Sequence, residues 1–183
     1  MPEHRHVFVY VGSYTVERTP PDRFVPEQGA SKGIRVFRVE PITKEWKLVQ
    51  EVEQLNPMYL LFGKGAETLY AASSDSNYVY AYRVDRETGL LSFLNRQQIT
   101  GQSTLCLSAT RGFTHLIVGA ISGAMASISL CEDGALGNVC DQFNLPGERG
   151  PLRGEQPFPR PHHCPFDPLG RHCYVLDKGG DAV

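Results

Sequence analysis

Short apolar stretches separated by turns run along the whole chain, and none of them shows the 3.6-residue period of an amphipathic helix. The stretches are rich in β-branched and aromatic residues, and glycine, proline, asparagine or aspartate bound most of them, which predicts β-strands. We therefore expect an all-β protein. The predicted strands are His6–Tyr14, Gly33–Val39, Trp46–Val52, Pro57–Phe62, Thr68–Ser73, Tyr78–Val84, Leu91–Asn95, Thr104–Ala109, His115–Ala120, Ala124–Leu130, Asn138–Asn144, His163–Phe166 and Cys173–Asp177.

Two of these segments recur along the chain at a period of about 46 residues. The sequence Gly-Ile-Arg-Val-Phe-Arg-Val at 33–39 is echoed by 78–84 and, more faintly, by 124–130. Repeats of this size, made of short strands and turns, are typical of a β-propeller in which each repeat is one four-stranded blade. The second recurring segment is found at 68–72, 115–119 and 173–177.

Dividing the chain by this repeat gives a β-propeller of about three and a half four-stranded blades. The first blade lacks its innermost strand, as in a propeller whose C-terminus returns to supply it. An open arc exposes two sheet faces and unpaired edges, so we expect further C-terminal blades or a second copy to close the ring. The predicted parts are 1–55 (blade 1), 56–101 (blade 2), 102–145 (blade 3), 146–161 (a long top-face loop) and 162–183 (the start of blade 4).

Two long connections, 15–32 and 145–161, fall on the same face of the predicted ring, where binding sites usually lie. His162 follows the second loop at the start of an innermost strand, near the mouth of the central channel. A histidine there can act as general base or acid, or it can simply hydrogen-bond loop backbone. His163 should point to the opposite side of the strand, between blades, because successive side chains alternate.

Charged side chains on the second loop widen this candidate site. Arg149, Arg153 and Arg160 could hold a phosphate or carboxylate by paired hydrogen bonds, although solvated loops use the same residue types. We predict no metal site, because the spacing of His162, Cys164 and the distant His172 fits no known ligand pattern.

Composition narrows the class of partner. The chain is 41% hydrophobic and 21% charged with a formal net charge of −2, which gives no electrostatic reason to expect nucleic acid or a membrane surface. Its apolar runs are of strand length, and the first residues lack the apolar stretch of a signal peptide. The five cysteines contain no Cys-x-x-Cys pair and are expected to be buried and reduced, so we predict a cytoplasmic protein.

Five segments of the chain form a recognisable series: 10–15 (Tyr-Val-Gly-Ser-Tyr-Thr), 31–34, 56–60, 82–91 and 162–171. In this order they resemble the N-terminal half of the seven-bladed lactonase family, which includes propeller-type 6-phosphogluconolactonases and fungal carboxymuconate cyclases. The resemblance implies a full ring of seven blades, or about 320 residues at this period.

The resemblance also assigns roles to residues. The second histidine of the family's Pro-His-x-His motif falls on His162, which is implied to be catalytic, whereas the first falls on Arg160. Gln156 is in register with the family's upstream Arg-Gln-Glu triplet. The implied substrate-binding residues are Arg160, Arg153 and Gln156, with no cofactor. The family's asparagine after the third blade's second strand is Ala120 here.

The function implied is a lactonase that hydrolyses a small sugar lactone such as 6-phosphogluconolactone, in carbohydrate metabolism. His162 would activate water, and Arg160 would stabilise the oxyanion or the substrate phosphate. Three alternatives stay open: a carboxymuconate cyclase-type intramolecular lyase, a non-catalytic propeller that only binds ligands, and a fragment that is inactive alone.

Overall fold

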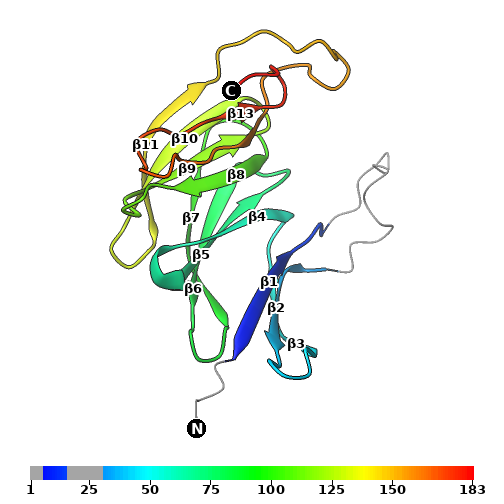
Figure 1. Ribbon diagram of the computed structural model, residues 1–183, viewed down its shortest axis with the longest axis vertical. Helices are drawn as coiled ribbons and strands as arrows, with labels where there is room; N and C mark the ends of the chain where they lie inside the picture. The colour runs from blue at the N-terminus through cyan, green and yellow to red at the C-terminus, as the bar shows by residue number, and fades with distance from the viewer. Residues whose placement is uncertain (1–5, 16–30) are drawn as a thin grey trace.

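The computed structural model describes residues 6–15 and 31–183, which form four antiparallel sheets (Figure 1). The first sheet contains β1 (Val7–Gly12), β2 (Gly33–Val39) and β3 (Trp46–Glu53). The second contains β4 (Pro57–Phe62), β5 (Thr68–Ser73), β6 (Tyr78–Val84) and β7 (Leu91–Gln98), with a 3₁₀ turn at Lys64–Ala66. The third contains β8 (Thr104–Ala109), β9 (His115–Ala120), β10 (Ala124–Leu130) and β11 (Leu136–Asn144), and the fourth contains β12 (Pro161–His163) and β13 (Leu176–Asp177).

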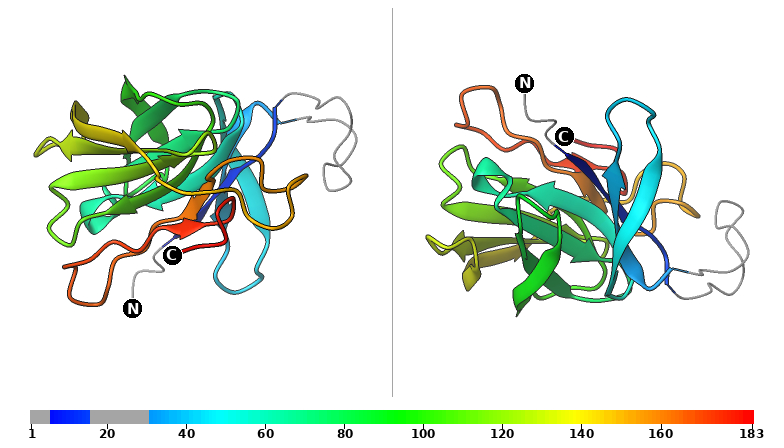
Figure 2. Two further views of the ribbon diagram at one scale, coloured as in Figure 1. Left: turned by 90° about the horizontal axis from the view of Figure 1, so that it is seen from above. Right: turned by 90° about the horizontal axis from the view of Figure 1, so that it is seen from below.

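The four sheets follow one another around an open arc, from β1–β3 in blue and cyan to β12–β13 in red (Figures 1 and 2). Within each sheet, strands that are consecutive in sequence lie side by side. The inner strand β8 contacts both β4 and β12, so the first strands of the later sheets line the inside of the arc. The predicted all-β propeller of about three and a half blades is confirmed.

Most predicted strands have the observed bounds, but those of the fourth blade are wrong. The inner strand lies at Pro161–His163 instead of His163–Phe166, and the predicted strand at 173–177 is reduced to β13. A single bridge between Phe166 and Cys173 continues the pairing. A two-stranded sheet has no outer strands to extend its ladder, which explains the short pairing.

The two long connections differ in what the structure describes. Most of the predicted 15–32 loop, residues 16–30, lies outside the described residues. The connection between β11 and β12 is described, and it crosses the top of Figure 1 as an extended segment.

The hydrophobic core lies between neighbouring sheets. Leu69, Ile34 and Val36 are buried between the first and second sheets. Cys106, Met125 and Cys164 are buried between the third and fourth. Because strand side chains alternate between two faces, each full blade contributes one face to each neighbour. The largest core, between the second and third sheets, includes Tyr70, Leu107, Leu116, Val118 and Ile128.

Hydrogen bonds repeat from blade to blade as the sequence does. The hydroxyl of Tyr10 donates to the carbonyl oxygen of Gly89 at 2.7 Å, and that of Tyr70 donates to Gly134 at 2.9 Å. Both bonds join the second strand of one blade to the turn before the outer strand of the next blade. They hold neighbouring blades together at the face opposite the long β11–β12 loop.

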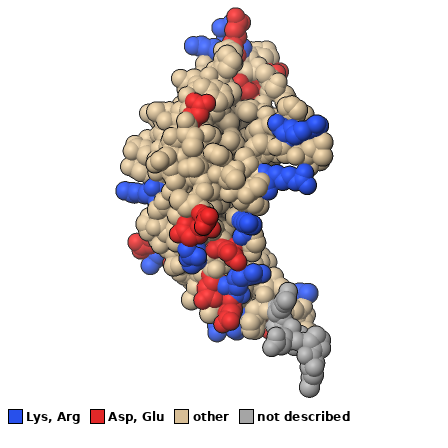
Figure 3. All heavy atoms as spheres, turned by 90° about the vertical axis from the view of Figure 1, so that its left-hand side faces the viewer, with Lys and Arg blue, Asp and Glu red and all other residues tan. Residues whose placement is uncertain are grey.

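Acidic and basic side chains lie intermingled on the face shown in Figure 3. They do not gather there into one large area of a single sign. Within the described residues, no helix has the length and apolar character needed to span a bilayer.

Candidate functional site

A β-bulge opens the inner strand of each of the three later blades. The pairing register shifts between Pro57 and Tyr59 in β4, between Thr104 and Cys106 in β8, and between Pro161 and His163 in β12. The extra residues are Met58, Leu105 and His162. A bulge leaves its extra residue unpaired and re-aims its side chain, and such positions are common beside active sites.

The bulge corrects the prediction for His163. Instead of pointing away from His162, His163 lines the same hollow of about 440 Å³, together with Leu176, Asp177 and Lys178. Strict alternation of side chains holds only for regularly paired strands, and the extra residue at 162 interrupts it. Both histidine side chains are exposed. The structure therefore presents two imidazoles, one next to the other, at the start of β12.

Arg160 lies two residues before His162 and is fixed through its backbone. Its N–H donates to Oδ1 of Asp177 at 2.5 Å, and its carbonyl accepts from the N–H of Lys178 at 3.1 Å. In its side chain, Nη1 donates to the carbonyl of Glu155 at 3.1 Å, while Nε is buried without a hydrogen-bond partner. A buried guanidinium donor without a partner is costly unless a ligand or water supplies an acceptor.

Asp177 organises this segment and was not singled out from the sequence. It is buried at the end of β13, and its Oδ1 accepts from the N–H groups of both Arg160 and Gly179, the second at 2.8 Å. Gly179 itself has no room for a side chain, since an added Cβ would lie 1.9 Å from the carbonyl oxygen of Phe158. Asp177 thus ties the end of the long loop to the second strand of the blade.

Gln156 and Arg153 differ in their surroundings. Gln156 is buried, its Nε2 donates to the carbonyl of Lys178 at 2.8 Å, and its Oε1 accepts from the N–H of Leu152 at 2.9 Å. Both ends of its amide therefore bind backbone, so Gln156 holds the loop against the end of β13. Arg153 is exposed on the same loop.

A tyrosine from another blade reaches the histidines. The hydroxyl of Tyr59, on β4, lies 3.3 Å from Nδ1 of His163, and the two rings are 6.3 Å apart between centroids. Burial, with smaller contributions from the thiols of Cys164 and Cys106, raises the pKa of Tyr59. At neutral pH the phenol is therefore protonated and can donate to an imidazole or a ligand.

No group of three or more His, Cys, Asp or Glu side chains in residues 6–15 and 31–183 is arranged to hold a metal ion. His172 contacts Asp167, with Nδ1 3.6 Å from Oδ2, in the short turn that follows β12. The side chains described at the start of β12 supply imidazole, guanidinium and phenol groups.

A sequence profile described as "Lactonase, 7-bladed beta-propeller" matches residues 8–183. The chain belongs to this lactonase family.

Individual lactonase relatives agree with this assignment. The 6-phosphogluconolactonase of Bacillus subtilis (strain 168) is 29% identical over 180 residues, which cover 95% of this chain and 47% of the relative. A crystal structure of a candidate 6-phosphogluconolactonase from Bacteroides fragilis NCTC 9343 superposes with a TM-score of 0.83 at 26% identity, covering 99% of this chain and 48% of that one. The chain thus spans about half the length of the relatives that it matches.

A third lactonase structure shares the fold at lower identity. The periplasmic gluconolactonase PpgL of Pseudomonas aeruginosa matches with a TM-score of 0.81 and 22% identity, over 96% of this chain and 48% of that one. At this identity the likeness shows the fold alone.

The sequence predicted His162 and Arg160 as site residues, and this remains a prediction, whereas it did not single out Asp177 or Tyr59. The sequence contained one signal for Asp177, which ends a predicted strand and is followed, after Lys178, by Gly179 and Gly180. Tyr59 carried none, because its contact with His163 joins residues 104 positions apart in the sequence.

Proposed function

We propose that the protein is a lactonase that hydrolyses a sugar lactone in carbohydrate metabolism, with 6-phosphogluconolactone as the first substrate to test. One observation carries the proposal. An unpaired, exposed imidazole at the His162 bulge follows Arg160, whose buried Nε lacks a partner. A general base, and a cationic donor two residues before it in the sequence, are groups that ester hydrolysis uses. Similarity to the Bacillus subtilis 6-phosphogluconolactonase supports the choice of substrate.

In the proposed reaction, His162 accepts a proton from water while the water oxygen bonds to the lactone carbonyl carbon. The carbonyl oxygen becomes an oxyanion, and Arg160 stabilises it by donating hydrogen bonds. The ring C–O bond then breaks, the imidazolium returns the proton to the leaving ring oxygen, and an open-chain hydroxy acid is released. No redox step or group donor is involved.

Other loop residues have supporting roles in this proposal. Arg153, exposed on the loop, is available to bind the phosphate of a phosphorylated substrate. Gln156 and Asp177 act by positioning, since each binds backbone of the segment that carries Arg160.

The test measures kcat/KM for 6-phosphogluconolactone with the full-length gene product, because this chain spans about half the length of its relatives. We expect His162→Gln to lower kcat/KM by about 10² to 10⁴ and Arg160→Gln by about 10². The matched control is His172→Gln, an exposed histidine held near Asp167, which should leave the rate unchanged. Undiminished hydrolysis by His162→Gln would remove His162 from the mechanism.

The same assay separates the alternatives. Turnover of a carboxymuconate without turnover of any lactone would replace the lactonase proposal with an intramolecular lyase. A ligand-induced rise in unfolding temperature without turnover would indicate a binding propeller.

A further inference from the structure

A second hollow lies away from the histidines, where the first and second blades meet. It has a volume of about 630 Å³, and we call it the rim hollow. The residues that line it belong to strands of the first two sheets or directly flank them. Its polar and aromatic lining includes Ser31, Lys32, Glu53, Gln54, Tyr80 and Arg96.

Gln54 is the first unusual feature of the rim hollow. It is only 6% exposed, and its Oε1 accepts a hydrogen bond from the hydroxyl of Tyr82 at 2.9 Å. Its Nε2 is buried without a hydrogen-bond partner. Turning the amide over would exchange the two atoms and leave one of them without a partner all the same. Buried polar atoms of this kind are few in proteins, and each is costly.

The repeat shows that the propeller itself does not need this amide. The N–H of Gln54 donates to the carbonyl of Lys32 at 3.0 Å, and in the next blade the N–H of Ile99 donates to the carbonyl of Asn77 at 3.0 Å. Ile99 therefore occupies the position of Gln54. Ile99 packs with Ile128 in the core between the second and third blades, where the first junction has Gln54 and Tyr82. A polar pair has replaced an apolar one, and this favours a function over stability.

Other residues that line the rim hollow also differ from their counterparts at the junction between the second and third blades. Tyr80 pairs with Arg96 across β6 and β7, as Ala126 pairs with Gln142 across β10 and β11. At the second junction, Oε1 of Gln142 accepts from the N–H and the hydroxyl of Thr100, at 2.6 and 2.8 Å. At the first junction Arg96 occupies the position of Gln142, and it lines the open rim hollow.

Charge indicates what the rim hollow would hold. Two cationic side chains, Lys32 and Arg96, line it against the single carboxylate of Glu53. Neither cation has a carboxylate within salt-bridge distance among the described residues, although Arg96 lies over the ring of Tyr78, with Cζ 4.4 Å from its centroid. The rim hollow therefore offers hydrogen-bond donors and a net positive lining. Both features favour a ligand whose oxygen atoms carry negative charge.

We propose that the rim hollow binds a small organic anion through a phosphate or carboxylate group. Its oxygens accept hydrogen bonds from Nε2 of Gln54, from Lys32 and from Arg96, and the ring of Tyr80 forms part of the wall beside the rest of the ligand. The site lies on the first two blades and is separate from His162 and Arg160 on the fourth.

The test is isothermal titration calorimetry on the full-length protein carrying His162→Gln, Arg160→Gln and Arg153→Gln, so that the proposed anion-binding groups of the active site are removed. The probes are inorganic phosphate, gluconate and 6-phosphogluconate. We expect saturable binding of at least one probe. Binding of phosphate but not gluconate supports the site with phosphate as the group, and the reverse supports it with carboxylate.

Substitutions of the lining residues test whether the observed binding takes place in the rim hollow. Lys32→Gln and Arg96→Gln should each weaken it about threefold or more, while Lys47→Gln, an exposed lysine on β3, should not. Gln54→Glu keeps the acceptor for Tyr82 but replaces the free donor with a negative oxygen, and should weaken binding about tenfold or more. Binding of none of the probes, or binding that these three variants leave unchanged, would overturn the proposal.

A double variant distinguishes a ligand site from a structural role. Gln54→Leu with Tyr82→Phe imitates the apolar pair of the next junction, and should abolish binding while raising the unfolding temperature. A fall in unfolding temperature, with binding retained, would contradict the proposal.

Discussion

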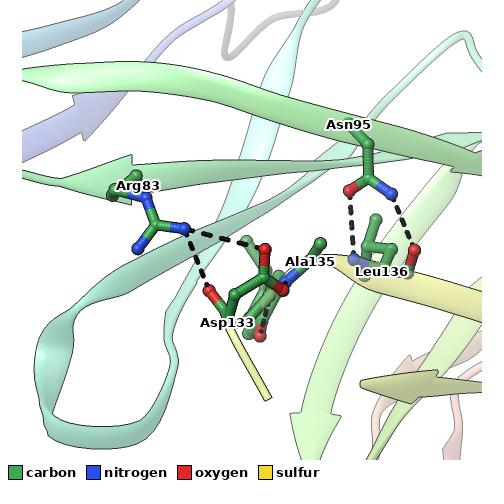
Figure 4. Close-up of polar contacts among 7 residues, drawn as sticks. Arg83, Asn95, Asp133, Ala135 and Leu136 are labelled. Carbon is green, nitrogen blue, oxygen red and sulfur yellow. Dashed lines mark hydrogen bonds and ion pairs between the residues drawn. The ribbon is translucent and has the colours of Figure 1, made fainter. Parts of the chain in front are cut away.

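Asn95 on β7 binds both backbone polar groups of Leu136, the first residue of β11 in the next blade (Figure 4). Its Nδ2 donates to the carbonyl oxygen at 2.6 Å, and its Oδ1 accepts from the N–H at 3.0 Å. Gln50 binds Leu91 in the same way, at 2.8 and 2.7 Å, over the same separation of 41 residues. Only an amide side chain offers both a donor and an acceptor in this geometry. The outer strands of successive blades are thus joined by a repeated contact.

Asn95→Ala should lower the free energy of unfolding by about 2 kcal/mol, because two hydrogen bonds are lost and the backbone groups of buried Leu136 are left unpaired. Urea denaturation measures the change. The control is Asn138→Ala on β11 of the next sheet, where the exposed amide makes no such pair, and its effect should stay within about 0.5 kcal/mol. Equal effects of the two variants would contradict the role of Asn95.

Tyr70 should make stability depend on alkaline pH. Burial raises its pKa from 10.0 to about 12, since the neutral phenol donates to Gly134 while the phenolate would be desolvated. A raised pKa in the folded state means that this contribution is fully present below pH 10 and is lost as the pH rises toward 12. Tyr70→Phe should lower the free energy of unfolding near neutral pH by about 1 kcal/mol. The variant should also lose less of its free energy of unfolding as the pH rises above 10. If the parent protein and Tyr70→Phe show the same dependence of stability on pH, the role given to Tyr70 is wrong.

Gly119 should not tolerate a side chain. An added Cβ would lie 2.6 Å from Sγ of Cys106 and 3.2 Å from Cβ of Pro161, in the packed space between the third and fourth blades. Gly119→Ala should therefore destabilise the protein by about 1 to 3 kcal/mol, measured by thermal denaturation. It should also lower lactonase activity, because Pro161 directly precedes His162. Gly112→Ala is the control, since its Cβ would meet only Cγ2 of Thr114 at 3.7 Å.

Asp177→Ala should destabilise the protein by about 1 to 3 kcal/mol, because it leaves the N–H groups of Arg160 and Gly179 without their acceptor. Asp177→Asn keeps Oδ1 as an acceptor, so its free energy of unfolding should lie closer to that of the parent protein. Chemical denaturation of the two variants gives the comparison. If the asparagine variant loses as much stability as the alanine variant, the negative charge of Asp177 matters more than its hydrogen bonds.

The sequence predicted the blades well because their determinants are local. Strands such as β5 (Thr68–Ser73) and β10 (Ala124–Leu130) have the expected bounds, since short apolar stretches and flanking turn residues specify them without reference to distant parts of the chain. The recurrence of these strands at a constant period was enough to identify a propeller.

The site was harder to predict because it depends on contacts over long separations. The alternation rule placed His163 on the wrong side, since the bulge at His162 is visible only in the pairing of β12 with β13. For Gln156, predicted as a substrate-binding residue, no sequence pattern indicated that its amide binds the backbone of Leu152 in the loop and of Lys178 after β13. The partnerless Nε atom of Arg160 depends on how the loop folds over it, which no local pattern records.

The bulges at the inner strands also bear on how such a ring changes over evolutionary time. Their extra residues have no partner in the ladder, so replacing one of them leaves the register of the sheet intact. Equivalent positions already hold a thioether in Met58, an aliphatic chain in Leu105 and an imidazole in His162. Each blade can therefore acquire or lose a reactive group at its inner strand independently of the others, without a change in the pairing of the strands that carry it.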